Sequence, residues 1–460
     1  MKGFKKLIAL TLALASLSSV AVGCSQSGTS STASASKAPA ASTGKASSGE
    51  IYYLNFKPEI ADVYQKISDA YKQETGVTLK VETAAAGTYE QTLKSAMAKA
   101  DAPVLFQING PKGYINWKDY CADLKDTELY KHLTDKTMAV TDGDGVYGIP
   151  YVVEGYGIIY NNAIMQKYFA LSGAKAKSMD EINNFAKLKE VAEDMTAKKG
   201  QLGIKGVFSS TSLKHGEDWR WQTHLANLPV YYEFKDNKID LKSDATKEVK
   251  FQYADNFKNI FDLYLKNSVT VPKMLGSKSV DDSMAEFALG QSAMVQNGNW
   301  AWSQISGVDG NVVKESDIKF LPIYTGMKDE EKQSICIGTE NFFAINKKAP
   351  ADQQKLAADF INWLYTSDKG KAFVTNDLKF IAPFDTFKDN EKPTDPLAKE
   401  VIRYMSDTKL TNVPWNFTVF PSQTFKDNFG AALLQYAQGT KQWNDVTKQF
   451  VEQWKSESGK

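Results

Sequence analysis

The N-terminal part of the chain alternates between the apolar spacing of a strand and that of a helix. Short apolar runs predict strands, and apolar residues three or four positions apart predict the helices between them. The predicted elements are, in order, a strand at 51–55, a helix from Ile60 to Gly76, a strand at 77–81, a helix at 88–99 and a strand at 104–108. This βαβαβ order is typical of a parallel sheet with helices on its faces.

Two local signals set the helix ends in this region. Gly76 follows the last apolar position of the first helix, where a left-handed glycine commonly ends a helix. Thr88 and Gln91 have the spacing of a capping box, which predicts where the second helix begins.

Polar and aromatic residues follow these strands and begin these helices. Ligands of open α/β sheets bind at such places, just beyond the strand ends. We therefore expect ligand contacts from Asn55, Lys57, Glu59, Tyr89 and Asn109.

A hairpin and an unusual strand follow. The Asp-Gly-Asp-Gly stretch at 142–145 predicts a hairpin turn, because it lacks the later ligands and the closing Glu of a calcium loop.

The run at 151–161 is apolar and aromatic except for Glu154. Because an unpaired buried carboxylate is costly, Glu154 should face a polar cleft, accept hydrogen bonds or pair with a cation. The alternative is an exposed position on an alternating strand.

The stretch at 293–303 predicts a strand that ends at an Asn-Gly turn and leads into a helix. In a helix, Trp300 and Trp302 lie about 200° apart, so they face opposite sides. We expect Trp300 to face the open side, next to Asn299, and Trp302 to face the core. An exposed indole beside amides suits a sugar, because the ring covers its C–H face and the amides bind its hydroxyls. The alternative is that both tryptophans are core residues.

A second aromatic group lies at 217–224 and contains Trp219, Trp221 and His224. Such a density of aromatic residues is unusual for a surface loop, and we expect one of its two indoles to be a core anchor.

Other patterns predict further secondary-structure elements. They are helices at 179–198, 251–265 and 353–365, a strand at 320–322, a turn at 338–340 followed by a strand, an aromatic loop at 415–421, and a closing helix that buries Trp443 and Trp454.

The N-terminus carries targeting signals. Three lysines and then an apolar stretch at 7–22 predict a secretory signal over residues 1–23. Small residues before Cys24 resemble a lipoprotein signal, which predicts lipidation of Cys24; the alternative is ordinary signal cleavage. The Ser- and Ala-rich stretch at 24–49 predicts a flexible tether. A long tether behind a lipid anchor suggests the outer face of a Gram-positive membrane.

Composition narrows the function classes. The chain has 460 residues, 42% hydrophobic and 24% charged, so more than one core is expected. The formal net charge of +1 gives no sign of nucleic-acid binding. Only 3 His and 3 Cys occur, which argues against a His/Cys metal site, and no cofactor is predicted. Cys121 and Cys336 could form a disulfide after secretion or remain buried thiols.

Four segments, in order, resemble extracellular solute-binding proteins of carbohydrate ABC transporters, the maltose-binding-protein-like group. They are 147–151 with Glu154 and 160–161, then 297–303, 338–346, and 359–365 with 368–370. The resemblance covers about 51–455 and implies an α/β fold of two lobes with an interlobe cleft. It places one lobe at 50–152 with 325–378 and the other at 153–324 with 379–460. The chain would cross a hinge near 151–156, 320–327 and 376–384.

The resemblance also implies roles for particular residues. Trp300 matches the stacking tryptophan of the family, Glu154 a polar contact beside the hinge, and the Trp219 to Trp221 segment a second aromatic wall. Further expected ligand contacts are Tyr156, His224, Gly338, Thr339, Glu340 and Trp415.

The function implied is binding, without chemistry on the ligand. The protein would be a monomer that closes on an oligosaccharide, such as a maltodextrin or an α-galactoside, and delivers it to a membrane permease. One alternative is a secreted glycosidase, which needs two carboxylates across the scissile bond. Another is a binding protein for a non-sugar solute, such as a peptide or polyamine.

Overall fold

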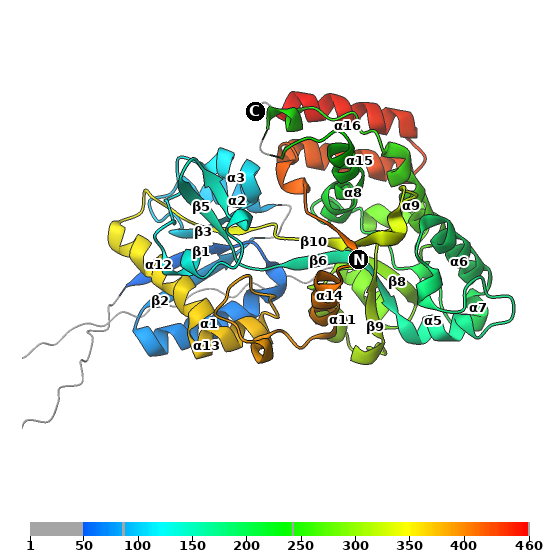
Figure 1. Cartoon of the computed structure of the whole chain (residues 1–460), viewed down its shortest axis with the longest axis horizontal. Coiled ribbons are helices and arrows are strands. Elements are labelled where there is room, and N and C mark those ends of the chain that lie inside the picture. The colour runs from blue at the N-terminus through cyan, green and yellow to red at the C-terminus, as the bar shows by residue number, and fades with distance from the viewer. Residues whose placement is uncertain (1–48, 85–87, 242, 459–460) are drawn as a thin grey trace, which may run out of the picture. The chain divides into compact units, whose positions relative to one another are not determined.

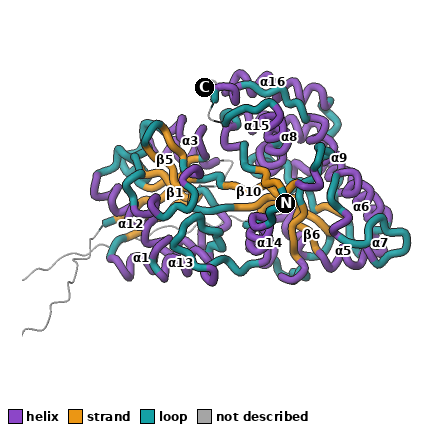
Figure 2. Tube along the Cα trace, in the orientation of Figure 1, coloured by secondary structure: helices purple, strands orange, loops and turns teal. Residues whose placement is uncertain are grey.

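The computed structural model describes residues 49–84, 88–241 and 243–458. Residues 46–460 belong to one compact unit, whose elements are shown in Figures 1 and 2. The predicted signal peptide, Cys24 and all but the last residue of the predicted tether lie outside the described residues.

The strands form two sheets. They are β1 Glu50–Asn55, β2 Thr78–Thr83, β3 Leu105–Ile108, β4 Val140–Asp142, β5 Gly145–Pro150, β6 Glu154–Asn161, β7 Gly206–Phe208, β8 Ser292–Gly298, β9 Ile318–Leu321, β10 Gln333–Gly338, β11 Phe342–Ile345 and β12 Thr411–Val413. The first sheet has the order β2-β1-β3-β11-β5-β4, and the second has the order β12-β10-β6-β8-β7, with β9 also paired to β6.

Helices cover both sheets. They are α1 Ala61–Thr75, α2 Tyr89–Met97, α3 Gly110–Trp117, α4 Glu128–Lys131, α5 Asn162–Phe169, α6 Phe185–Ala197, α7 Lys199–Leu202, α8 Asn227–Asp236, α9 Ala254–Asn267, α10 Val280–Ala288, α11 Ala301–Ser306, α12 Ala351–Thr366, α13 Asp368–Ala372, α14 Pro396–Ser406, α15 Gln423–Ala437 and α16 Trp443–Ser458. The site also uses the π-helix η5 Arg220–Leu225 and the 3₁₀ helix η12 Phe417–Val419.

The first lobe, defined as the first sheet with its helices, begins with the predicted βαβαβ unit. Strands β1, β2 and β3 are parallel, as predicted. Residues of α1 and α12 form the core on one face of this sheet, and residues of α2 and α3 form the core on the other (Figure 1). Gly76 ends α1 in the left-handed conformation, as predicted.

The second lobe is the second sheet with its helices. Its central strand, β6, pairs along one edge with β8 and along the other edge first with β10 and then with β9. Helices α5, α6, α8, α9, α15 and α16 contribute to the core on one face, and α10, α11 and α14 to the core on the other. The predicted closing helix is confirmed, because Trp443 and Trp454 of α16 are buried.

The two lobes are joined by adjacent antiparallel connections. Phe342 pairs with Pro150 in the first sheet, and Gly338 pairs with Glu154 in the second. The connections at 151–153 and 339–341 therefore run side by side between the lobes. A third passage follows Glu391, which is still paired with Lys371 of the first lobe, and precedes α14 of the second.

One predicted hinge crossing differs from the path of the chain between the two sheets. Strand β10 lies in the second sheet, so the chain passes back at 339–341 and not near 320–327. The predicted crossing near 376–384 does lie beside the hinge, because Ile381 pairs with Val153 and packs in the core of the second lobe, before the chain returns to the first lobe at Phe384. Pro322 follows the end of β9, which is why the sequence predicts a crossing between the lobes there. In the structure, β9 and β10 pair with successive parts of the same edge of β6.

Three local predictions differ from the structure. The Thr88 side chain makes no cap hydrogen bond, although α2 begins where predicted. Helix α6 begins only after Asn184, whose side chain accepts from the Lys187 amide. Helix α9 begins at Ala254, because Phe251 has a φ of 53° and cannot be helical. The 142–145 hairpin is present, and Cys121 and Cys336 are free and buried.

Candidate functional site between the lobes

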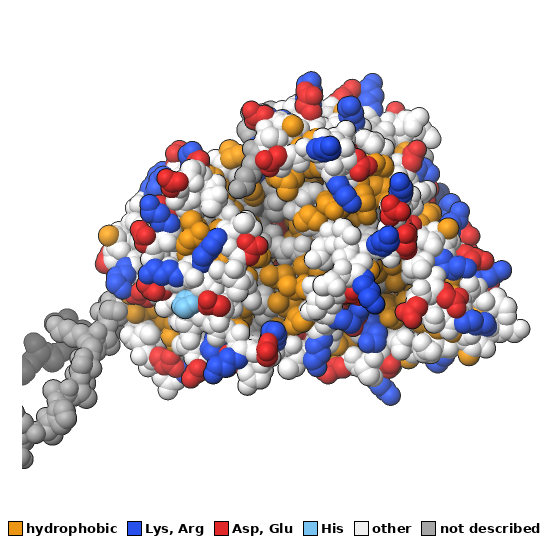
Figure 3. Space-filling model, in the orientation of Figure 1, with side chains coloured by type: hydrophobic (Ala, Val, Ile, Leu, Met, Phe, Trp, Pro, Cys, Tyr) orange, Lys and Arg blue, Asp and Glu red, His pale blue; other side chains and the backbone are white. Residues whose placement is uncertain are grey.

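A cavity of about 300 Å³ lies between the two lobes. Figure 3 shows the molecule hollowed between the elements of the two sheets, with apolar side chains in the walls of the hollow. Its volume is at the lower end of the range for small-molecule sites. The lining comes from both lobes and from the connection at 339–341. It consists of Phe56, Lys57, Pro58, Glu59, Glu90, Asn109, Glu154, Gly216, Glu217, Asp218, Trp219, Arg220, Gln222, Thr223, Val280, Asp281, Trp300, Gln304, Glu340, Gln423, Lys426 and Asp427.

Two indoles of the second lobe form an aromatic wall. Trp300 follows β8 and Trp219 precedes η5, and their ring centroids are 5.8 Å apart with the planes at 46°. Trp302 is buried in the core, so the prediction that Trp300 faces the open side and Trp302 the interior is confirmed. The Arg220 guanidinium lies 3.9 Å from the centroid of the Trp219 ring and holds that indole from behind by a cation–π contact.

Buried aromatic rings support this wall. Tyr156 stacks on Trp300 with centroids 6.1 Å apart, and His224 contacts both Trp219 and Trp300. Only 1% of His224 is exposed. Burial, reinforced by the charge of Arg220, lowers the pKa of His224 well below its usual value. His224 is therefore a neutral packing residue behind the indoles.

Three charged residues meet where the first lobe approaches the hinge. Lys57 Nζ lies 2.7 Å from Glu154 Oε1 and 3.5 Å from Glu59 Oε1. Burial lowers the pKa of Lys57, but Glu154 and Glu59 outweigh burial and raise it above its usual value. The buried Glu154 therefore pairs with a cation, one of the outcomes expected from its sequence context. Lys57 Nζ also lies 5.3 Å from the ring centroid of Trp300, which ties the aromatic wall to the first lobe.

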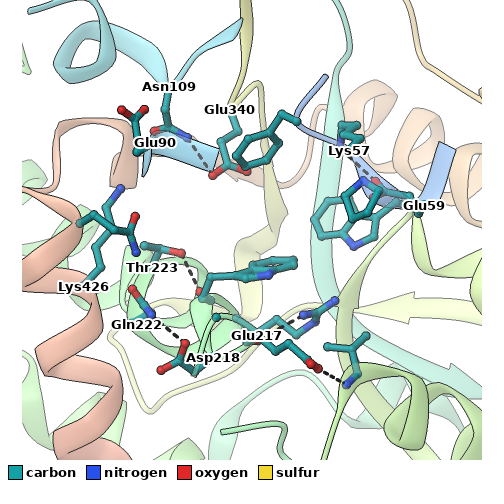
Figure 4. Close-up of a pocket in the computed structure, with 18 of the residues that line it drawn as sticks. Lys57, Glu59, Glu90, Asn109, Glu217, Asp218, Gln222, Thr223, Glu340 and Lys426 are labelled. Atoms are coloured by element: carbon teal, nitrogen blue, oxygen red, sulfur yellow. Dashed lines mark hydrogen bonds and ion pairs between the residues drawn. The ribbon is translucent and has the colours of Figure 1, made fainter. Parts of the chain in front are cut away.

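A second polar group lies across the cavity from Lys57 and Glu59 (Figure 4). Asn109 donates to Glu340 Oε1 at 3.0 Å, and the Trp117 indole donates to Glu90 Oε2 at 3.0 Å. Burial raises the pKa of Glu340 to about 6. Burial also lowers the pKa of Lys426, against the opposing effect of Glu340 and Glu90.

The floor of the cavity is a short polar segment of the second lobe. Gln222 Nε2 donates to Asp218 Oδ1 at 3.0 Å, and Glu217 accepts from the Val280 amide at 2.6 Å. Burial raises the pKa of Asp218 to about 6. Gly430 of α15 lies against this carboxylate, because a Cβ there would be 1.9 Å from Asp218 Oδ2.

The structure brings some of the predicted contact residues to the cavity and places the others behind its walls. Those that line it are Lys57, Glu59, Asn109, Glu154, Trp219, Trp300 and Glu340. Those that do not line it are Asn55, Tyr89, Tyr156, Trp221, His224, Asn299, Gly338, Thr339 and Trp415.

The residues behind the walls have structural contacts. Asn55 donates to the Lys57 carbonyl and positions the loop that carries Lys57. Tyr89 donates to the Leu54 carbonyl and accepts from the Gln107 amide. Asn299 is turned inward, where its Oδ1 accepts from the Gly155 amide at 2.9 Å. The prediction that Asn299 lies beside an open cleft is therefore wrong in this structure, because its amide joins the end of β8 to β6.

The remaining residues behind the walls fill the second lobe near the hinge. Trp221 lies in the core and donates to the Ser212 carbonyl, so one indole of the 217–224 group is a core anchor, as predicted. Gly338 leaves room for Trp415, since a Cβ there would lie 2.7 Å from the Trp415 ring. Thr339 donates to the Asn341 carbonyl within the connection.

Sequence reasoning missed several lining residues, above all Glu90 and Lys426. Both are helical residues whose polar neighbours in sequence are typical of a solvated face. Asp218, Gln222 and Arg220 belong to the aromatic group that the sequence did single out. Their proximity to two indoles was a usable signal, although the π-helical geometry of η5 was not predictable from periodicity.

A family model described as bacterial extracellular solute-binding protein matches residues 66–400. The chain belongs to the bacterial extracellular solute-binding protein family. No curated protein sequence matches the chain. No helix among residues 49–84, 88–241 and 243–458 of this solute-binding protein is long and apolar enough to cross a membrane.

Solved structures share the fold of this solute-binding protein. A chitin oligosaccharide binding protein has a TM-score of 0.68 and 16% identity, and the match covers 91% of this chain and 100% of that chain. The solute-binding protein RafE in complex with raffinose has a TM-score of 0.63 and 18% identity, with coverage of 88% and 99%. Maltose-bound MalE3 of T. maritima has a TM-score of 0.63 and 16% identity, with coverage of 89% and 100%. The predicted two-lobed α/β fold is confirmed.

The ion pair between Lys57 and Glu154 gives a testable stability effect. Lys57→Met should lower the free energy of unfolding by about 3 kcal/mol, because Glu154 is left buried without a cation. The double variant Lys57→Met/Glu154→Gln should recover most of this loss, because the more deeply buried carboxylate, Glu154, is removed together with the cation, and only the longer contact of Lys57 with Glu59 stays broken. Urea denaturation at pH 7.5 measures both values. Equal destabilisation of the single and double variants would contradict a buried, ionised pair.

Proposed function

We propose that this solute-binding protein captures a neutral oligosaccharide between its lobes and delivers it to the permease of an ABC importer. The observation that carries the proposal is the pair of indoles, Trp219 and Trp300, inside an interlobe cavity lined by carboxyl and amide groups. Indole faces cover the C–H faces of sugar rings, and carboxylates and amides bind hydroxyl groups.

The charge of the cavity supports a neutral ligand over an anionic one. Its lining contains Glu59, Glu90, Glu154, Glu217, Asp218, Asp281, Glu340 and Asp427, against only Lys57, Arg220 and Lys426. An anionic solute would add charge of the sign already in excess. Sugar hydroxyls, in contrast, can donate hydrogen bonds to carboxylates without adding charge. This charge balance does not disfavour a cationic solute such as a polyamine, so the preference for a sugar over a polyamine rests on the two indole faces in the cavity.

The fold neighbours support the same ligand class. Their names give raffinose, maltose and chitin oligosaccharide as ligands, and all three are neutral. We propose an oligosaccharide and not a single sugar, with maltodextrins and α-galactosides as the first candidates. Closure of the lobes around the ligand would create the state that the permease recognises.

We propose that the protein binds its ligand without transforming it. The family is one of solute-binding proteins, and Glu154, a carboxylate that stands out in an apolar stretch of the sequence, is held by Lys57 beside the hinge. A glycosidase would release reducing ends from a panel of glycans. Turnover that disappears in a Glu154→Gln variant would overturn binding as the sole function.

We also propose an extracellular, lipid-anchored monomer. The support is the sequence of residues 1–49, in which a secretory signal precedes Cys24 and a Ser- and Ala-rich tether follows it. Lipidation of Cys24 would hold the folded unit near the outer face of the membrane, where a permease is within reach.

The aromatic wall predicts a loss of affinity in one variant. Trp300→Ala should weaken oligosaccharide binding by about 1–3 kcal/mol, roughly 5- to 150-fold in Kd, because stacking area is lost. Isothermal titration calorimetry measures the change. Trp363→Ala is the matched control, because this partly buried indole of the first lobe contacts Glu74 outside the cavity. Unchanged affinity in a folded Trp300→Ala protein would make Trp300 a purely structural residue.

If the lobes close on the ligand, a substitution at the contact between α3 and η12 should also change the affinity for the ligand. Gly110 has a φ of 61°, and a Cβ there would lie 2.6 Å from Thr418 Cβ in the opposite lobe. Gly110→Ala should therefore weaken binding by about fivefold or more, because the closed state becomes strained.

Gly143→Ala is the control for this variant, because Gly143 has a φ of 55° and nothing within 4 Å of the added Cβ. Both variants introduce similar backbone strain and should lower the thermal midpoint. Only Gly110→Ala should also lose affinity. Equal affinities in the two variants would show that binding does not need this contact between the lobes.

A further inference from the structure

The ammonium group of Lys426 lacks a partner in the cavity wall. Lys426 lies on α15 and lines the cavity. Its backbone amide donates to the Ser422 carbonyl, but its ammonium group makes no hydrogen bond or ion pair within 4 Å with any residue at 49–84, 88–241 or 243–458. The other two lysine and arginine residues of the lining are held, Lys57 by carboxylates and Arg220 by Trp219 and Asn297. An unpaired charge next to a cavity calls for a ligand atom that accepts hydrogen bonds.

Hydrogen-bond acceptors with spare capacity face the same part of the cavity. Glu340 accepts only from Asn109 and Glu90 only from Trp117 among the described residues, which leaves one carboxylate oxygen free on each. Gln222 is 2% exposed, and its Oε1 atom is buried with no partner among those residues. These acceptors call for ligand atoms that donate.

The labelled side chains lie around one space. In Figure 4, Glu90, Asn109 and Glu340 approach the cavity from one side, and Lys426, Gln222 and Thr223 lie on the other walls. Glu90 and Asn109 belong to the first lobe, Lys426 and Gln222 to the second, and Glu340 to the connection between them. A ligand group bound here would therefore contact both lobes and the hinge.

Simple chemistry selects the ligand group. An ammonium group only donates hydrogen bonds, so it would satisfy the carboxylates and repel Lys426. A carboxylate or phosphate only accepts, so it would satisfy Lys426 and repel Glu90 and Glu340. A hydroxyl group donates one hydrogen bond and accepts others, so it suits both sets at once. Two adjacent hydroxyls provide two donors, one for each carboxylate, and two oxygens for the ammonium group.

We infer that Glu90, Asn109, Glu340 and Lys426 form a subsite for two adjacent hydroxyl groups of one sugar ring, separate from the stacking contact at Trp219 and Trp300. In this subsite, one hydroxyl donates to Glu340 and the other to Glu90, and both accept from Lys426. The inference rests on the proposed sugar-binding function. It specifies the ligand further as a saccharide with a free vicinal diol on the ring bound at this subsite.

The subsite makes affinity depend on pH. The Glu340 carboxylate is faced by Lys57 and Lys426, by Glu154 and Glu90, and by the amide of Asn109, and burial raises its pKa to about 6. The ionised form accepts the ligand hydroxyl, so binding should weaken as the pH falls from 7.5 to 5. The folding stability of the protein without ligand should change in the opposite direction and increase as the pH falls. A raised folded-state pKa contributes stability below the unfolded value, and this contribution is lost as the pH rises through 6.

The test uses the purified protein and three probes, maltotriose, raffinose and N-acetylchitotriose, with tryptophan fluorescence as the readout. The probe that binds most tightly is then compared with its monodeoxy analogues, each lacking one ring hydroxyl. The variants are Lys426→Met and Glu340→Gln, alone and combined. Lys448→Met, on the exposed face of α16, is the control.

We expect Lys426→Met and Glu340→Gln each to weaken binding by about tenfold or more, since each removes a charged hydrogen-bond partner. The combined loss should be smaller than the product of the two, because both residues bind the same diol. Wild-type protein should discriminate against analogues that lack either of two adjacent hydroxyls, and Lys426→Met should lose much of this discrimination. Glu340→Gln should also reduce the fall in affinity between pH 7.5 and 5, although Asp218, which lines the same cavity and whose pKa burial also raises to about 6, still titrates in this range.

The thermal stability of the Lys426→Met variant distinguishes a ligand-binding role of Lys426 from a structural role. Lys426→Met removes an unpaired charge, so the thermal midpoint of the empty protein should stay the same or rise. Wild-type affinity in a folded Lys426→Met protein, or discrimination that the variant fully retains, would overturn the subsite while sugar binding itself stands. Wild-type protein that binds none of the three probes would overturn both the proposed function and this inference.

Discussion

The buried ion pair between Lys57 and Glu154 joins the two lobes beside the hinge. Lys57 follows β1 in the first lobe, and Glu154 is the first residue of β6 in the second. Both side chains are at least nine-tenths buried, so each depends on the other for compensation of its charge. Because Lys57 also lies over the Trp300 ring, this pair fixes the distance between the loop after β1 and the aromatic wall.

The cavity owes its form to a second layer of residues that do not line it. Tyr156, His224 and Trp415 pack behind Trp300, and Gly338 gives Trp415 the space it needs. Asn299 holds the turn after β8 against β6 through paired contacts with Gly155. Packing within the second lobe therefore holds Trp300 in place. Such preorganisation lowers the ordering entropy that binding must overcome.

The two lobes contribute different kinds of side chain to the cavity. The second lobe contributes the aromatic wall and Lys426, and the first lobe contributes Lys57, Glu59, Glu90 and Asn109. Neither lobe by itself carries both the stacking surface and the full set of hydrogen-bonding groups. Under the proposed function, a ligand would bind most tightly to a closed state, because groups from both lobes are needed to complete the site.

The sequence predicted which segments form strands and helices better than it predicted which strands pair and which side chains meet. The βαβαβ unit, the turn before Trp300 and helix α16 follow from local periodicity and turn residues, and each is present. The sheet to which a strand belongs does not follow from its own residues, so β10 was placed in the wrong lobe. Asn299, Tyr156 and His224 are predicted contacts that lie behind the cavity walls, because the direction of a side chain depends on packing from distant segments. Glu90 and Lys426 were missed because a charged residue on a helix usually faces solvent.

The most direct test of this account is a titration of tryptophan fluorescence with a panel of neutral and acidic oligosaccharides. We expect a saturable change with one class of neutral oligosaccharide and none with uronic acid oligomers of the same length, because carboxylates outnumber cations in the cavity. A folded protein that responds to no sugar, or that prefers the acidic oligomers, would contradict it.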